Sequence, residues 1–290
     1  MIKFICPQCK AFLLFEKEKY VCPVDGKVYK IINGITVFIE NLEEFEREER
    51  QYLGKPASQA KMVKDKTKKL NFYIRSRPSE ILLQRGFKDK KGIDIGCGSG
   101  KNENFEHIYE KISRDVVGIE VSLTAAKSFK NNYPDVPCIL ATKLPLEDNT
   151  FDFVVASGLV HHLIGEPWDI ILSSFSEWHR VLKQGGMLIL NDPNLLYFFS
   201  LLAHIPNRIL QKIKPGARER VPYERPILFF EVFPLLKNVG FKNINCEADT
   251  FAHRFFPKRV IDVLTKYENA VCNMFPFKYL GHWITIYAEK

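Results

Sequence analysis

The sequence predicts a doubly wound α/β fold: a mostly parallel seven-stranded sheet with helices on both faces, preceded by a small β module. From residue 91 onward, short apolar runs alternate with helix-length segments, which is typical of βαβ units. A glycine-rich turn follows the first of these runs. Before residue 41, hairpin-like runs and closely spaced cysteines indicate a different kind of unit. The length of 290 residues leaves room for a domain of about 200 residues and a small module.

The first unit covers residues 1–40. Its short β-type runs, at 20–21, 28–32 and 36–39, alternate with Gly26 and Gly34 and therefore predict hairpins. Residues 41–70 follow as a charged helical linker in which an acidic stretch precedes a basic one.

The small module contains two copies of a metal-ligand spacing. Cys6 and Cys9 are separated by two residues, and Cys22 and Asp25 repeat that spacing. Three thiolates and a carboxylate are an acceptable ligand set for zinc, and so small a unit buries too little surface to fold easily without a staple. The alternative is a ribbon that has lost its metal and is held by packing on the main domain.

The third unit, residues 71–290, contains the predicted sheet. Its candidate strands are residues 92–95, 116–119, 136–140, 151–156 and 187–190, followed by 241–246 and 283–288. Helix-length segments separate most of the first five, so we expect those strands to be parallel.

The stretch from Asp94 to Gly100 joins a strand to a helix and is rich in glycine. Glycines are needed there because a side chain would keep a cofactor from the backbone. Glu120, at the end of the next strand, is placed to accept hydrogen bonds from a ribose. Gly100 follows Gly98 by two positions, whereas the fingerprint of dinucleotide-binding enzymes requires three. The spacing therefore argues against an NAD-dependent enzyme. A tight turn without a ligand is the alternative.

Two further motifs specify the family. They run from Leu144 to Asp152 and from His179 to Gly186. With the glycine turn, they make residues from about 70 to 290 resemble the class I S-adenosylmethionine-dependent methyltransferases, in their small-molecule-type branch. The resemblance implies a Rossmann-like fold, the cofactor S-adenosylmethionine and transferase activity. Residues 1–40 resemble the zinc-ribbon family found beside tRNA-methyltransferase activators.

The resemblance also implies a set of cofactor contacts. Gly96, Cys97 and Gly98 would line the methionine part, with Asp94 near its amino group. Glu120 would hold the ribose. The remaining expected contacts are Val121, Ala141 and Thr142 around the adenine, and Ser157 beside the methyl group. Many relatives have an Asp where this chain has Leu140, so one adenine contact is missing from the pattern.

Candidate catalytic residues follow the fourth and fifth strands. His161 or His162 would act as a general base, and Asp192 lies where ligands bind in this architecture. The alternatives are packing or capping roles for the histidines and capping of the following helix for Asp192.

Two insertions, at 194–225 and 249–280, are rich in apolar and aromatic residues. We expect them to cover an apolar or aromatic acceptor; plain packing against each other is the alternative.

Composition leaves the acceptor open. The net charge of +8 is compatible with RNA, which makes an RNA methyltransferase that uses the N-terminal module the second hypothesis. A non-catalytic, cofactor-binding partner of another methyltransferase is the third. Seven cysteines, no signal-peptide pattern and no apolar run near 20 residues favour a cytoplasmic protein without a transmembrane segment. The sequence does not indicate an oligomeric state.

Overall fold

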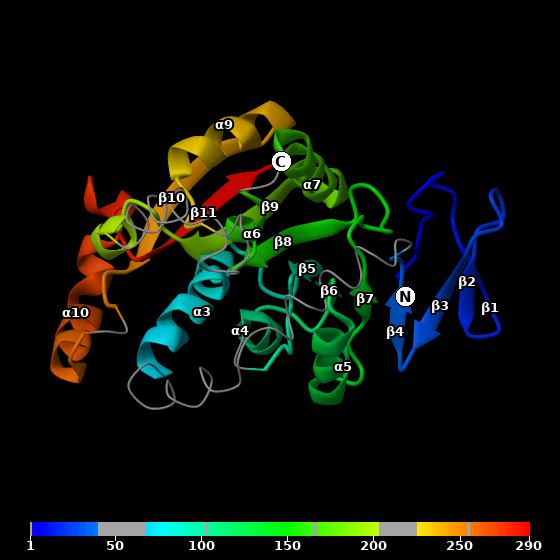
Figure 1. Cartoon of the computed structure of the whole chain (residues 1–290), viewed down its shortest axis with the longest axis horizontal. Helices are drawn as coiled ribbons and strands as arrows, with labels where there is room; N and C mark the ends of the chain where they lie inside the picture. The colour runs from blue at the N-terminus through cyan, green and yellow to red at the C-terminus, as the bar shows by residue number, and fades with distance from the viewer. Residues whose placement is uncertain (1, 40–67, 102–103, 165–166, 203–224, 254–255) are drawn as a thin grey trace, which may run out of the picture.

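The computed structural model describes residues 2–39, 68–101, 104–164, 167–202, 225–253 and 256–290. These residues form a layered α/β structure in which helices cover both faces of one twisted sheet (Figure 1). The sheet has 11 strands in the order β1-β2-β3-β4-β7-β6-β5-β8-β9-β11-β10.

Seven of the strands form the sheet expected for the large domain. In chain order they are β5 (Gly92–Ile95), β6 (Val116–Glu120), β7 (Cys138–Leu140), β8 (Phe151–Ser157), β9 (Leu182–Pro193), β10 (Lys242–Thr250) and β11 (Trp283–Glu289). Strands β7, β6, β5, β8 and β9 are parallel neighbours, and β11 pairs antiparallel with both β9 and β10. The predicted fold class is therefore confirmed. Because β10 continues through Thr250, which pairs with Trp283, the second insertion begins after the predicted Asp249.

The helices sort onto the two faces by the side chains they bury. They are α3 (Lys68–Gln84), α4 (Asn104–Lys111), α5 (Leu123–Asn132), α6 (Val160–Leu163), α7 (Trp168–Val181), α9 (Phe229–Val239) and α10 (Lys258–Val271), with a short 3₁₀ helix, η1 (Phe277–Tyr279). Alternate residues of β8 enter two separate cores: Val154 packs with residues of α7 and α9, and Val155 packs with residues of α3, α4 and α5. Side chains of β8 thus face a core on each side of the sheet, as expected where helices cover both faces.

Arg180 links the two motifs on which the family resemblance rests. Its guanidinium donates to the carbonyl oxygens of Leu144 (3.0 Å) and Leu146 (2.6 Å) and to the carboxylates of Asp148 (2.6 Å) and Glu177 (2.8 Å). The loop before β8 is thereby held to the end of α7.

The N-terminal strands extend the same sheet. They are β1 (Leu14–Glu16), β2 (Lys19–Val21), β3 (Val28–Ile32) and β4 (Ile35–Val37), and β4 pairs parallel with β7. Phe4, Tyr29 and Phe38 belong to the same core as α7 and α9. Packing on the large domain therefore stabilises the module, whether or not a metal is bound. The division at residue 40 stays a prediction, and most of the predicted linker lies outside the described residues. No helix within the described ranges is long and apolar enough to span a membrane.

Candidate functional site

The carboxyl ends of β5, β6, β8 and β9 meet at one edge of the sheet, and the predicted cofactor and catalytic residues lie at or just after these ends. The strands are labelled in Figure 1. Ile95, the last residue of β5, is paired with Ile119 on one side and Ala156 on the other. The glycine turn therefore lies between Glu120, at the end of β6, and Ser157, at the end of β8. In this architecture, ligands bind outside this edge.

The turn after β5 depends on glycine. Gly96, Gly98 and Gly100 have φ values of 74°, 57° and 75°, in the left-handed region that side chains disfavour. A Cβ on Gly100 would lie 2.7 Å from the Tyr133 ring, whereas the nearest atom to one on Gly96 would be a Leu159 methyl group at 3.6 Å. The turn is thus tightly packed at Gly100, and Leu159 packs against it at Gly96.

Glu120 is buried at this turn, and backbone amides hold its carboxylate. Oε2 accepts the N–H of Gly98 at 2.8 Å, and Oε1 accepts those of Val121 (2.8 Å) and Ser122 (3.1 Å). These bonds join the end of β6 to the glycine turn and fix the carboxylate at the edge of the sheet. Glu120 therefore has a structural task besides any role toward a ribose.

The other expected cofactor contacts differ in their burial. Asp94 and Ala141 are buried, Val121 is partly buried, and Thr142 is exposed. The Cys97 thiol is fully buried, which raises its pKa well above the usual value. Cys97 therefore contributes its backbone to the turn and not a reactive thiolate.

His161 and Asp192, predicted separately, lie in direct contact. Nδ1 of His161 is 2.7 Å from Oδ1 of Asp192, whose side chain is completely buried. The carboxylate also accepts the backbone N–H groups of Val160 (3.3 Å) and His161 (3.2 Å). Asp192 therefore accepts hydrogen bonds from the first two residues of α6. Because Nδ1 faces Asp192, Nε2 is the nitrogen left to meet a ligand. The His162 ring lies 4.1 Å from that of His161, centroid to centroid.

A buried polar network beneath this edge was not predicted. Ser157 donates to Asn191 (2.9 Å), and Asn191 donates to Asp249 (2.5 Å) and Thr285 (2.9 Å). Thr285 in turn donates to Asp249 at 2.6 Å. Burial raises the pKa of Asp249 to about 7. The members come from β8, β9, β10 and β11, so no local pattern in the sequence reveals the network.

The described parts of the two insertions pack together at the same edge. The Tyr197 hydroxyl donates to the Phe251 carbonyl at 2.9 Å, and the Tyr197 ring lies 5.0 Å from that of His282. Trp283 lies near Gly158. A Cβ built on Gly158 would be 3.8 Å from the Trp283 ring and 4.0 Å from the His161 ring. Residues 203–224 of the first insertion lie outside the described residues.

In the N-terminal module, two turns of the same design face each other. The N–H of Lys10 donates to the Cys6 carbonyl (2.9 Å), and the N–H of Gly26 donates to the Cys22 carbonyl (3.0 Å). Lys10 and Gly26 both have positive φ, 62° and 72°. In the second turn, Asp25 occupies the place that Cys9 has in the first.

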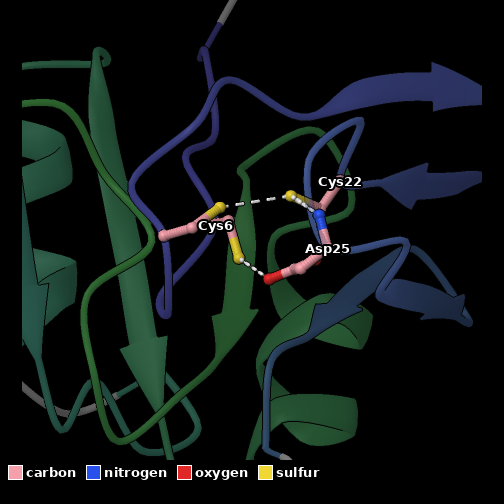
Figure 2. A group of neighbouring side chains, drawn as sticks. Cys6, Cys22 and Asp25 are labelled. Carbon is pink, nitrogen blue, oxygen red and sulfur yellow. Dashed lines mark hydrogen bonds between the residues drawn. The ribbon is translucent and has the colours of Figure 1, made fainter.

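These turns gather the predicted metal ligands. One ligand atom from each of Cys6, Cys9, Cys22 and Asp25 lies within 4.8 Å of the others. The Cys6 thiol is 3.2 Å from an Asp25 oxygen (Figure 2), and the Cys9 and Cys22 sulfurs are 3.4 Å apart. Sulfurs bound tetrahedrally to one zinc at ~2.3 Å are roughly 3.8 Å apart, so the cluster is of a size that fits one ion.

Comparisons with known proteins agree with this architecture. Residues 93–190 match the family model described as a methyltransferase domain. A probable S-adenosylmethionine-dependent methyltransferase of Mycolicibacterium smegmatis is 29% identical over 133 residues, which cover 44% of this chain and 48% of that protein. An uncharacterized protein of Methanocaldococcus jannaschii is 32% identical over 111 residues, covering 37% and 44% of the two chains. The chain thus spans about half the length of these curated relatives.

A solved structure has the same fold. It is that of a SAM-dependent methyltransferase, a possible histamine N-methyltransferase, from Thermotoga maritima, with a TM-score of 0.52 and 20% identity over 86% of this chain and 98% of that one. Residues 93–190 are thus similar to a methyltransferase domain, and the strand order and the glycine turn agree with the fold of class I S-adenosylmethionine-dependent methyltransferases.

Proposed function

We propose that this chain transfers a methyl group from S-adenosylmethionine to a small, apolar or aromatic, lipid-like acceptor. The observation that carries the proposal is the meeting of the glycine turn, Glu120 and the His161–Asp192 pair at one edge of the sheet. The first two suit a nucleoside, and the pair suits removal of a proton from a nucleophile.

The residues at the turn fit the cofactor. Gly96, Cys97 and Gly98 would line its methionine part, Glu120 would accept the ribose hydroxyls, and Asp94 would face the amino group. Val121, Ala141, Thr142 and Ser157 complete the proposed contacts. The sulfonium supplies an electrophilic methyl group without the help of a metal.

His161 would take the proton from the acceptor through Nε2, with Asp192 as its positioning residue. The buried Asp192 carboxylate fixes the ring and stabilises the imidazolium that forms. A nucleophile must also lie in line with the carbon–sulfur bond, at about 3 Å from the methyl carbon. His162, whose ring stacks beside that of His161, is the alternative base.

The two insertions would supply the acceptor pocket. Tyr197, Phe199 and Phe256 place aromatic rings at the carboxyl edge, which favours an apolar or aromatic acceptor over a polar one. A reducing, cytoplasmic environment, consistent with seven cysteines and no disulfide, belongs to the same proposal.

Calorimetry with S-adenosylhomocysteine tests the cofactor assignment. Glu120→Ala should weaken binding roughly 10- to 100-fold, because it removes charge-assisted hydrogen bonds. Asp135→Ala, at an exposed carboxylate between α5 and β7, should bind like the wild-type protein. Absence of binding by the wild type, or equal binding by the Glu120 variant, would reject the assignment.

The base is tested with single-turnover kinetics once an acceptor is found. His161→Gln should lower the rate by about 10²- to 10⁴-fold and remove the acid limb of the pH profile, while S-adenosylhomocysteine affinity is retained. An unchanged pH profile would leave His161 with only a packing role and direct attention to His162.

We also propose that Cys6, Cys9, Cys22 and Asp25 bind one zinc ion. The support is the convergence of four ligand atoms from two turns of the same design. Elemental analysis of protein purified without added metal should find about one zinc per chain, and Cys9→Ser should lower that content. A folded wild-type protein without zinc would instead favour a metal-free ribbon held by its packing.

A further inference from the structure

The outer side of α10 carries apolar residues that nothing in the described structure covers. Val260, Val263 and Tyr267, spaced three and four residues apart, lie on one side of the helix and are 41%, 58% and 58% exposed. The inner side is already occupied by its own contacts: Ile261 and Glu268 are buried. The helix therefore has a buried inner side and an apolar stripe that faces outward.

The segment after α10 enlarges this apolar surface. Met274, Phe275, Phe277 and Leu280 are 55%, 81%, 45% and 38% exposed. We call the outer stripe of α10 together with residues 274–280 the docking face. Single exposed apolar residues are ordinary, but seven within residues 260–280 favour an interaction surface.

The charges beside the docking face are mostly basic. Lys258, Arg259 and Lys266 are exposed and Lys278 is partly exposed, against one exposed carboxylate in the same segment, that of Asp262. The other carboxylate, that of Glu268, is buried and accepts the backbone N–H groups of Phe251 and Ala252. The segment therefore presents an apolar stripe flanked by positive charge, which is the pattern of helices that lie in the surface of an anionic membrane.

We propose that the docking face lies on an anionic lipid bilayer, with Phe275 and the α10 stripe among the acyl chains and the basic side chains at the headgroups. A symmetric contact with a second copy would place the basic residues of two identical faces against each other, which is unfavourable. Docked RNA would leave Val260, Val263 and Met274 without an apolar partner.

The docking face adjoins the candidate active site. The Phe277 ring lies 6.4 Å from that of Phe251, whose carbonyl accepts the Tyr197 hydroxyl of the first insertion. Asn194, directly after β9, donates to the Tyr279 carbonyl at 2.8 Å. The bilayer would therefore meet the edge of the sheet where the acceptor enters. We accordingly assign a membrane lipid or lipid-dissolved molecule as acceptor, a step that rests on the proposed methyl transfer, whereas the docking itself does not.

Sedimentation with vesicles tests the docking on the full chain. Binding should be weak to phosphatidylcholine alone and much stronger when phosphatidylserine is added, by about fivefold for each basic residue at the surface. The double variant Val263→Asp, Phe275→Asp should lower the partition coefficient at least about tenfold. The matched control is Val28→Asp, Phe15→Asp, at similarly exposed positions (46% and 61%) in the N-terminal module, at the far end of the molecule from α10 (Figure 1). It should bind like the wild type.

The outcomes separate the docking from the methyl transfer. The docking proposal would be overturned if both double variants lost vesicle binding equally, or if vesicle binding did not depend on phosphatidylserine. A wild-type dimer in light scattering that becomes a monomer in the Val263→Asp, Phe275→Asp variant would also overturn it. RNA binding that is lost only in this variant would do the same. S-adenosylhomocysteine calorimetry is run in parallel and should give the same affinity for all three proteins. Vesicle binding without cofactor binding would reject the methyl transfer and leave the docking in place.

Discussion

Replacing the buried carboxylate of Asp249 should change how the stability of the protein depends on pH. The side chain comes from β10 and accepts hydrogen bonds from Asn191 of β9 and Thr285 of β11. Burial raises its pKa to about 7, although both hydrogen bonds and the charge of Arg77 oppose the rise. The folded protein therefore keeps a proton on Asp249 at pH values where the unfolded chain has lost it.

The sign and size of the effect follow from the two pKa values. The value in the folded protein, about 7, is above the ordinary value of 3.8, so the stabilising contribution is complete below 3.8 and is lost as the pH rises through 7. Each pKa unit of difference between the folded and unfolded values corresponds to about 1.4 kcal/mol of stability, so the full difference contributes roughly 4 kcal/mol. Between about pH 5 and about pH 8, the free energy of unfolding should fall by roughly 2–3 kcal/mol through this group.

Asp249→Asn removes the titration and keeps the shape of the side chain. Urea unfolding of both proteins at the two pH values gives a double difference, in which groups that titrate equally in both proteins cancel. The free energy of unfolding of the wild type should fall by roughly 2–3 kcal/mol more than that of the variant between the lower and the higher pH. A double difference near zero would refute the assignment of a protonated Asp249.

Two further substitutions test the packing of the site and of the fold. Gly118→Ala would place a Cβ 2.8 Å from the Cys97 sulfur beneath the glycine turn, so S-adenosylhomocysteine affinity in calorimetry should fall at least about tenfold, and an unchanged affinity would contradict the tight packing. Arg180→Met removes the donor to the Leu144 carbonyl and to Asp148, so the free energy of unfolding in urea should fall by roughly 2–3 kcal/mol, and a loss below about 0.5 kcal/mol would contradict the linking role.

The sequence by itself determined the order and kind of the elements in the large domain. Strands such as Gly92–Ile95 and Phe151–Ser157 are buried on both faces, so their apolar runs are visible without knowledge of their neighbours. The glycine turn was equally visible, because left-handed backbone conformations select glycine locally. The two-residue spacings of Cys6 with Cys9 and of Cys22 with Asp25 were visible for the same reason, because each lies within one short turn. The structure brings these two turns together.

Only the tertiary structure decided which distant groups meet. His161 and Asp192 are 31 residues apart, and Asn191 and Asp249 are 58 apart. Their contacts result from the register of β8, β9, β11 and β10 and not from any local pattern. The addition of β4 to the edge of β7 was also invisible in the sequence, because short strands of three residues carry no mark of their partner. The local pattern of apolar residues indicates which face of an element is buried, whereas the neighbour of each strand depends on how all the strands assemble into the sheet.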